Sequence, residues 1–129
     1  MARIMVVDDE PAVAQAIADI LTEGGHETIV ARFGPGLLAD VTDREYDLLI
    51  IDIVMPEISG WELIKLVREK KPAAHVIAIS GGGGAFTAST ALEQSRRLGA
   101  AATIAKPIGV EALLKVVEVT LRAKPSVLN

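Results

Sequence analysis

The chain has 129 residues, half of them hydrophobic and only 3% aromatic, so it fits one domain with a core of aliphatic side chains. Its formal net charge of −4 argues against nonspecific binding to nucleic acid or to an anionic membrane, because both require a basic patch. The absence of cysteine excludes disulfides and thiolate metal sites, and no apolar stretch is long enough for a membrane span or a signal peptide. We therefore expect a cytoplasmic protein.

Apolar runs alternate with segments of helical periodicity five times, a pattern typical of βα units around a parallel sheet. Strands are expected at residues 3–7, 28–31, 48–51, 76–79 and 101–105. The expected helices run from Pro11 to the Gly24-Gly25 pair, around 37–41, from the Ser59 cap to Pro72, over 86–98, and through Leu113, Val117 and Leu121. The predicted fold is a three-layer α/β/α domain over 1–123 with right-handed crossovers, followed by a C-terminal tail at 124–129.

Charged residues directly follow three of these strands: Asp8-Asp9 the first, Asp52 the third and Lys106 the fifth. Taken singly, the aspartates would be helix N-terminal charges or turn residues. In an open α/β sheet, however, ligands bind at the carboxyl ends of the strands where the strand order reverses. If the first and third strands are neighbours, the carboxylates form an acidic cleft that requires a cation. Mg²⁺ fits, because it takes one or two carboxylates together with water and phosphate oxygens.

A carboxylate in such a cleft can act as a nucleophile and form an aspartyl phosphate. Phosphoryl transfer requires mainly positioning and charge neutralisation, which the cation would supply on one side and Lys106 on the other. Pro107 keeps Lys106 out of the helical region and permits a cis peptide bond. Ser80, at the end of the fourth strand, offers a hydroxyl to a phosphate oxygen. Each of these residues alone is also compatible with an ordinary turn, so the hypothesis depends on their combination.

The pattern Asp8-Asp9, Asp52-x-x-Met55-Pro56-x-x-x-Gly60, Ser80 and Lys106-Pro107 resembles the receiver domain of bacterial two-component response regulators over essentially the full length. The resemblance implies a flavodoxin-like sheet of strand order 2-1-3-4-5 and a phosphoacceptor signalling protein that is not an enzyme. It implies a histidine kinase or histidine phosphotransfer protein as donor, an unknown downstream partner, and an optional homodimer that depends on phosphorylation. The implied roles are phosphoacceptor for Asp52, Mg²⁺ or Mn²⁺ ligands for Asp8, Asp9, Asp52 and the Val54 carbonyl, phosphoryl contacts for Ser80 and Lys106, and structural turns for Gly60 and Pro107.

The chain departs from this pattern in two places. Many such domains carry an aromatic residue three positions before the lysine, where this chain has Thr103. Four consecutive glycines, 81–84, follow Ser80, and glycine samples positive φ without a steric cost. We therefore expect residues 81–85 to be mobile and to switch on phosphorylation, together with the helix that follows them.

Three other functions are considered. A P-loop enzyme requires a Gly-Lys pair, which is absent from the sequence, and a dinucleotide fingerprint requires glycine where Phe86 stands. An aspartyl-phosphate phosphohydrolase requires an acid at Val54, two residues after the acceptor. A degenerate receiver that acts only as a protein-interaction module remains an alternative, and both a stand-alone protein and a part of a longer one fit the sequence.

Overall fold

The computed structural model describes residues 2–31, 33–56, 58–81 and 88–123. Five strands and five helices alternate along this part of the chain. The strands are β1 (Arg3–Val7), β2 (Glu27–Val30), β3 (Leu48–Asp52), β4 (His75–Ser80) and β5 (Ala102–Ala105). The helices are α1 (Pro11–Glu23), α2 (Leu37–Asp43), α3 (Gly60–Lys70), α4 (Ala88–Arg97) and α5 (Val110–Arg122). None of these helices in the described ranges is long and apolar enough to cross a membrane.

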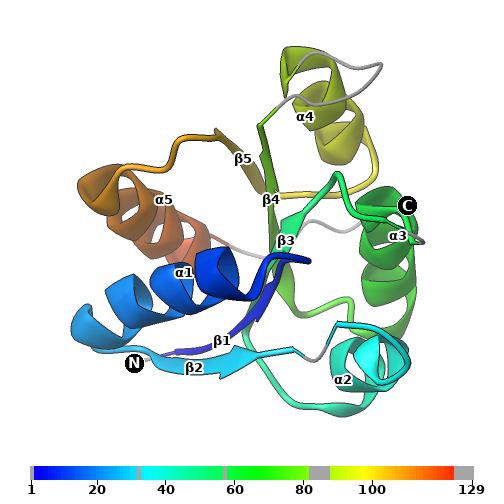
Figure 1. Ribbon diagram of the computed structural model, residues 1–129, viewed down its shortest axis with the longest axis horizontal. Coiled ribbons are helices and arrows are strands. Elements are labelled where there is room, and N and C mark those ends of the chain that lie inside the picture. Colours follow the sequence, from blue (N-terminus) through cyan, green and yellow to red (C-terminus); the bar gives the residue numbers. More distant parts are fainter. Residues whose placement is uncertain (1, 32, 57, 82–87, 124–129) are drawn as a thin grey trace.

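The five strands form one parallel sheet in the order β2-β1-β3-β4-β5, which confirms the predicted topology. Helices α1 and α5 cover one face of the sheet, and α2, α3 and α4 cover the other (Figure 1). Strands β1 and β3 are direct neighbours, with Val7 opposite Ile51. Their carboxyl ends therefore meet at one edge of the sheet. This adjacency is the condition on which the predicted acidic cleft depends.

The central strands read as continuous apolar runs because both of their faces are buried. Alternate side chains enter two separate cores: Ile4 and Val6 pack toward α1 and α5, whereas Met5 and Val7 pack toward α2 and α3. Burying one such side chain contributes about 1.5–3 kcal/mol. A slip of one residue would exchange the two sets of side chains, so the two cores fix the register that brings the strand ends together.

The predicted helix ends are confirmed at several positions. Pro11 is the first residue of α1, and Ser59 is the N-cap of α3, where its Oγ accepts a hydrogen bond from the Trp61 N–H at 3.1 Å. Gly25 and Gly99 follow α1 and α4 with φ of 94° and 113°, a left-handed conformation that glycine adopts without strain.

The predicted bounds of β2 are wrong by one residue, since the strand begins at Glu27. The Glu27 N–H donates to the Ala2 carbonyl at 2.9 Å, and its carboxylate lies 3.3 Å from the Arg3 guanidinium. These contacts pair Glu27 with the first residue of β1. An exposed acidic residue was not expected in a strand, but β2 is an edge strand and can carry charge on its open side.

The bounds of β4, β5 and α4 also differ slightly from the prediction. Strand β4 includes His75 and Ser80, and β5 begins at Ala102 because Ala101 still belongs to the turn after α4. Helix α4 is described from Ala88, so the predicted start at Phe86 lies outside the described residues, as does the predicted tail at 124–129.

Candidate functional site

The side chains singled out in the sequence come together at the carboxyl edge of the sheet. The strand register places these ends side by side: Val7 opposite Ile51, Asp52 opposite Ile79, and Ser80 opposite Ala105. Asp8 directly follows β1, Asp52 and Ser80 end β3 and β4, and Lys106 directly follows β5. Four strands therefore each deliver one polar group to the same place.

Lys106 joins two carboxylates from different strands. Its Nζ lies 3.0 Å from Oδ2 of Asp52 and 3.3 Å from Oδ2 of Asp8. Each aspartate is 5% exposed, whereas the lysine side chain is 24% exposed. The ammonium thus reaches two nearly buried anions from a partly open position and offsets the repulsion between them.

The second oxygen of each carboxylate is held by its own loop. Oδ1 of Asp8 accepts a hydrogen bond from the Glu10 N–H at 2.9 Å, and Oδ1 of Asp52 accepts one from the Val54 N–H at 3.0 Å. Both bonds run from a carboxylate to the backbone two residues ahead, an arrangement that aspartate favours after a strand. Oδ1 is therefore fixed in each case, and Oδ2 faces the cleft.

Burial and neighbouring charge shift the pKa values of this cluster. Burial raises the pKa of Asp52, and the charge of Asp8 acts in the same direction, against the opposing effects of Lys106 and the Val54 N–H. Burial lowers the pKa of Lys106, but the hydrogen bonds and charges of Asp52 and Asp8 outweigh it, and the net pKa is raised. The ammonium therefore stays charged at neutral pH.

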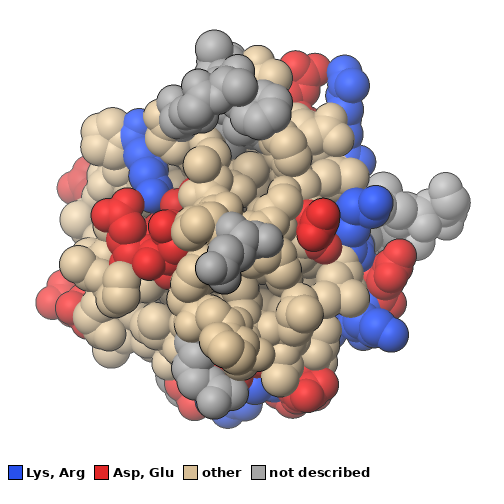
Figure 2. Space-filling model, turned by 45° about the vertical axis from the view of Figure 1, so that its right-hand side comes forward, with Lys and Arg blue, Asp and Glu red and all other residues tan. Residues whose placement is uncertain are grey.

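A group of three acidic side chains adjoins this pair. One carboxylate oxygen from each of Asp8, Asp9 and Glu10 lies within 4.8 Å of the other two, the one such group in the described part of the chain. Figure 2 shows acidic side chains gathered beside a basic one on this side of the molecule. Clustered carboxylate oxygens are the donors that Mg²⁺ prefers, so the residues present fit the predicted cation.

Glu10 was not among the predicted ligands. It is the N-cap residue of α1, where an acidic side chain has an ordinary explanation as a partner of the helix dipole. The available signal was its position directly after Asp8-Asp9. Asp52 is not part of this acidic group, and Lys106 connects it to Asp8.

Gly60 packs directly on the backbone that carries Asp52. A Cβ at this position would lie 2.6 Å from the Cα of Ile53 and 2.7 Å from the carbonyl oxygen of Asp52. The Gly60 N–H also donates to the Ile53 carbonyl at 3.2 Å. The residue predicted as a turn is thus the first residue of α3, and only glycine allows α3 to approach the end of β3 this closely.

The remaining predicted residues surround the cleft. Ser80 is fully buried, and its carbonyl accepts a hydrogen bond from the Lys106 N–H at 3.0 Å. The Lys106–Pro107 peptide bond is cis, and the residue Val54, two positions after Asp52, is 43% exposed. Thr103 lies half-buried in β5. Of the segment expected to be mobile, residues 81–85, all but Gly81 lie outside the described residues.

An apolar groove that the sequence did not predict borders Lys106. Its volume is about 610 Å³, and it runs between α1 and the segment after β5. The lining residues are Ala12, Val13, Ala16, Ile17 and Ile20 from α1, together with Gly81, Lys106, Pro107 and Ile108. The groove thus connects an apolar helix face to the cleft that holds Asp52.

Comparisons with known proteins agree with this geometry. The family model for the response regulator receiver domain matches residues 4–118. A response regulator receiver protein of Anaeromyxobacter sp. (strain Fw109-5) is 36% identical over 88% of this chain and 46% of its own length. The polar-differentiation response regulator DivK of Brucella ovis is 31% identical over 89% of this chain and 92% of its own length.

The solved structures give the same result. The receiver domain of NtrX from Brucella abortus superposes with a TM-score of 0.83 and 32% identity, covering 94% of this chain and 99% of that domain. The chain spans about half, 46%, of the first curated relative and 25% of the next. The sheet order, the site geometry and these similarities together show that the chain belongs to the response regulator receiver domain family.

Proposed function

We propose that the chain is a phosphoacceptor switch in which Asp52 receives a phosphoryl group from the phosphohistidine of a histidine kinase or a histidine phosphotransfer protein. The observation that carries this proposal is the nearly buried Asp52 carboxylate, with Oδ2 3.0 Å from Lys106 Nζ and acidic groups at the same edge. Membership of the receiver family supports the same signalling role.

In the proposed transfer, a carboxylate oxygen of Asp52 attacks phosphorus. The new O–P bond forms as the N–P bond to the donor imidazole breaks, and the released nitrogen takes up a proton. Lys106 and the Ser80 hydroxyl then contact the phosphoryl oxygens, with Lys106 exchanging a carboxylate for a phosphoryl partner. The hydrogen bond that Asp52 Oδ1 accepts from the Val54 N–H supports this role, because it fixes the orientation of the carboxylate.

The proposed cation is Mg²⁺ or Mn²⁺, held by Asp8, Asp9, Asp52 and the Val54 carbonyl, with Glu10 as an additional nearby carboxylate. When bound, the cation supplies positive charge that neutralises the phosphoryl oxygens. The clustered oxygens of Asp8, Asp9 and Glu10 support this assignment, since such a cluster is repulsive without a counter-charge.

The groove beside Lys106 supports a helical phosphodonor. Its apolar wall comes from α1, and an apolar helix face is the kind of surface that fits such a groove. A donor helix seated there would hold its phosphohistidine next to the cleft. The downstream partner, the phosphorylation-dependent homodimer and the cytoplasmic location expected from the sequence remain parts of this proposal.

The side chain of Val54 supports a switch over a phosphohydrolase. It lies exposed beside Asp52 and has no acid or base with which to activate water. We therefore expect the aspartyl phosphate to persist as a signal instead of being turned over rapidly.

The test is incubation of the chain with acetyl phosphate and Mg²⁺, followed by intact mass measurement. We expect one added phosphoryl group, lost in Asp52→Asn and suppressed by EDTA. Asp47→Asn is the matched control, because this carboxylate lies just before the same strand at the opposite edge and its amide oxygen can still accept the Arg3 N–H. Label retained on Asp52→Asn would place the acceptor elsewhere. An unlabelled wild type would favour an interaction module, and rapid continuous phosphate release would favour a phosphohydrolase.

A further inference from the structure

The first turn of α3 connects the backbone of Asp52 to α4. Gly60 lies against Ile53 and the Asp52 carbonyl, so the start of α3 is fixed to the end of β3. The next residue, Trp61, donates its backbone N–H to Ser59 Oγ and its indole Nε1–H to Ser95 Oγ, both at 3.1 Å. A continuous series of contacts therefore leads from the acceptor strand to a side chain of α4.

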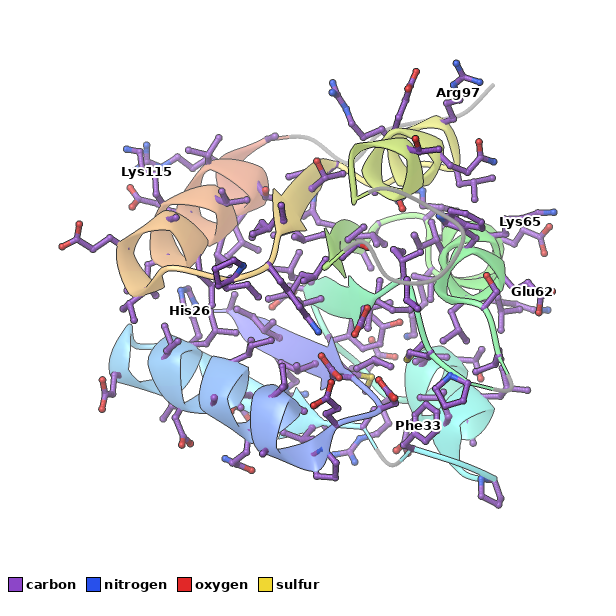
Figure 3. All side chains as sticks on the ribbon, turned by 45° about the horizontal axis from the view of Figure 1, so that its top comes forward. His26, Phe33, Glu62, Lys65, Arg97 and Lys115 are labelled. Carbon is purple, nitrogen blue, oxygen red and sulfur yellow. The ribbon has the colours of Figure 1, made fainter. Side chains whose placement is uncertain are left out.

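A polar side chain connects helix α4 to α3. Among the α4 side chains whose burial is described, Ser95 alone is buried, and it is fully so. Thr90, Glu93, Arg96 and Arg97 of the same helix are exposed. Figure 3 shows Arg97 of α4, and Glu62 and Lys65 of α3, projecting outward from the two helices. The Trp61–Ser95 contact thus lies where α4 meets α3.

We propose that the Trp61–Ser95 hydrogen bond holds α4 in the resting arrangement and couples its position to the chemical state of Asp52. This inference rests on the proposed function, and it assigns to Trp61 a positioning role and no contact with the reacting atoms.

The coupling follows from what the cleft must do on phosphorylation. In the structure Lys106 contacts the Asp52 and Asp8 carboxylates directly, and a phosphoryl group on Asp52 would take over that ammonium and attract the Ser80 hydroxyl. Ser80 ends β4, and the chain from it leads to α4. The start of α3 is held by the Gly60 contact and does not follow. Movement of α4 against a fixed α3 stretches the Trp61–Ser95 bond.

A hydrogen bond that exists only in the resting arrangement of α4 stabilises that arrangement relative to the phosphorylated arrangement. Removing it should therefore favour binding of a phosphoryl mimic at Asp52, because coupling between two sites is reciprocal. A neutral hydrogen bond contributes about 1 kcal/mol, which corresponds to roughly fivefold tighter binding of the mimic.

The experiment uses the full chain with Mg²⁺ and beryllofluoride as the phosphoryl mimic, and measures binding by calorimetry. Ser95→Ala removes the acceptor and Trp61→Phe removes the indole N–H while keeping an aromatic ring. Both variants, and the double variant, should bind beryllofluoride about fivefold more tightly than wild type. The double variant should gain no more than either single one, since all three lose the same bond.

Tyr46→Phe is the matched control. It also removes one hydrogen bond from an aromatic side chain in the same core, that of the Tyr46 hydroxyl to the Val41 carbonyl in α2, far from α4. We expect Tyr46→Phe to lose about as much stability as Ser95→Ala or Trp61→Phe, because each variant loses one hydrogen bond. Its beryllofluoride affinity should not change.

The emission of Trp61, the single tryptophan of the chain, gives a second readout in wild type and Ser95→Ala. Beryllofluoride should shift the wild-type emission, and Ser95→Ala should show part of that shift before the mimic is added. Wild-type affinity in both α3–α4 variants, or additive effects in the double variant, would overturn the inference. Failure of the wild type to bind beryllofluoride would instead overturn the proposed function.

Discussion

At the scale of single residues, Lys106 supplies the positive charge that contacts both Asp8 and Asp52. Both carboxylates are nearly buried, and each has one oxygen on its own loop and one on the ammonium. Removing one member of a buried ion pair generally costs about 3–5 kcal/mol, because the remaining charge is left without a partner. The cost here should be smaller, since the lysine is 24% exposed and water can reach the cleft.

We therefore expect Lys106→Met to lower the free energy of unfolding by about 1–3 kcal/mol at neutral pH without a divalent cation. Added Mg²⁺ should restore more stability to this variant than to wild type, because the cation would replace the lost positive charge. Urea unfolding with and without Mg²⁺ measures both effects. Lys115→Met, on the exposed side of α5 (Figure 3), is the control and should change neither quantity. Equal stability of the two variants would mean that the Lys106 contacts contribute nothing.

At the scale of elements, α1 contributes side chains both to the core and to the groove beside Lys106. One side buries Ala14, Ile17 and Leu21 against the sheet, and a neighbouring stripe that includes Ala12 and Ala16 lines the groove beside Lys106. Small side chains keep this groove open. The proposed phosphodonor would therefore dock on the same helix that stabilises the fold.

A charged, larger side chain in the groove should slow phosphoryl transfer from protein donors and leave transfer from small-molecule donors unchanged. We expect Ala16→Glu to reduce transfer from phosphorylated histidine kinases, tested as a panel of purified kinases, by at least about tenfold, because an unpaired carboxylate would be buried under a docked helix. Labelling by acetyl phosphate should stay at the wild-type rate. Ala112→Glu, an exposed alanine on α5, controls for the added charge. An equal loss of phosphorylation with kinases and with acetyl phosphate would show that Ala16→Glu damages the acceptor site itself and not a docking surface.

The sequence predicts most of the elements because periodicity and buried runs are local signals. Ile4–Val7 and Leu48–Ile51 are apolar throughout, and both strands are buried on two faces. The aspartates and Lys106 were placed correctly because each follows such a run directly. The groove and the Trp61–Ser95 contact were not predicted, since each joins segments far apart in the chain and neither has a characteristic spacing.

At the scale of the whole molecule, the two edges of the sheet differ in chemistry. The carboxyl edge holds the charged cleft, whereas the amino edge holds a cavity of about 410 Å³ bordered by His26, His75 and Asp47. His75 is the first residue of β4 and is 7% exposed, with Nδ1 buried and without a hydrogen-bond partner. Such an imidazole is accommodated best in its neutral form.

Burial lowers the pKa of His75 from its ordinary value of 6.5; nearby Arg68 lowers it further, and Asp47 opposes both. The unfolded chain therefore binds a proton at a higher pH than the folded chain does. Above about pH 6.5 His75 is neutral in both states and does not lower the free energy of unfolding. As the pH falls from about 6.5 through the folded pKa, only the unfolded chain gains the proton, and the free energy of unfolding decreases. Over the first unit below 6.5 this loss is at most about 1.4 kcal/mol.

We expect the wild-type free energy of unfolding, measured in urea, to be lower at about pH 5.5 than at about pH 7.5. His75→Gln, which does not titrate, should show a smaller difference between the two values of pH, whatever its overall stability. Ile77→Val, two residues along the same face of β4, is the control, because it should lose about 0.5–1.5 kcal/mol equally at both. A His75→Gln variant that keeps the full wild-type difference would place the pH dependence in groups other than His75.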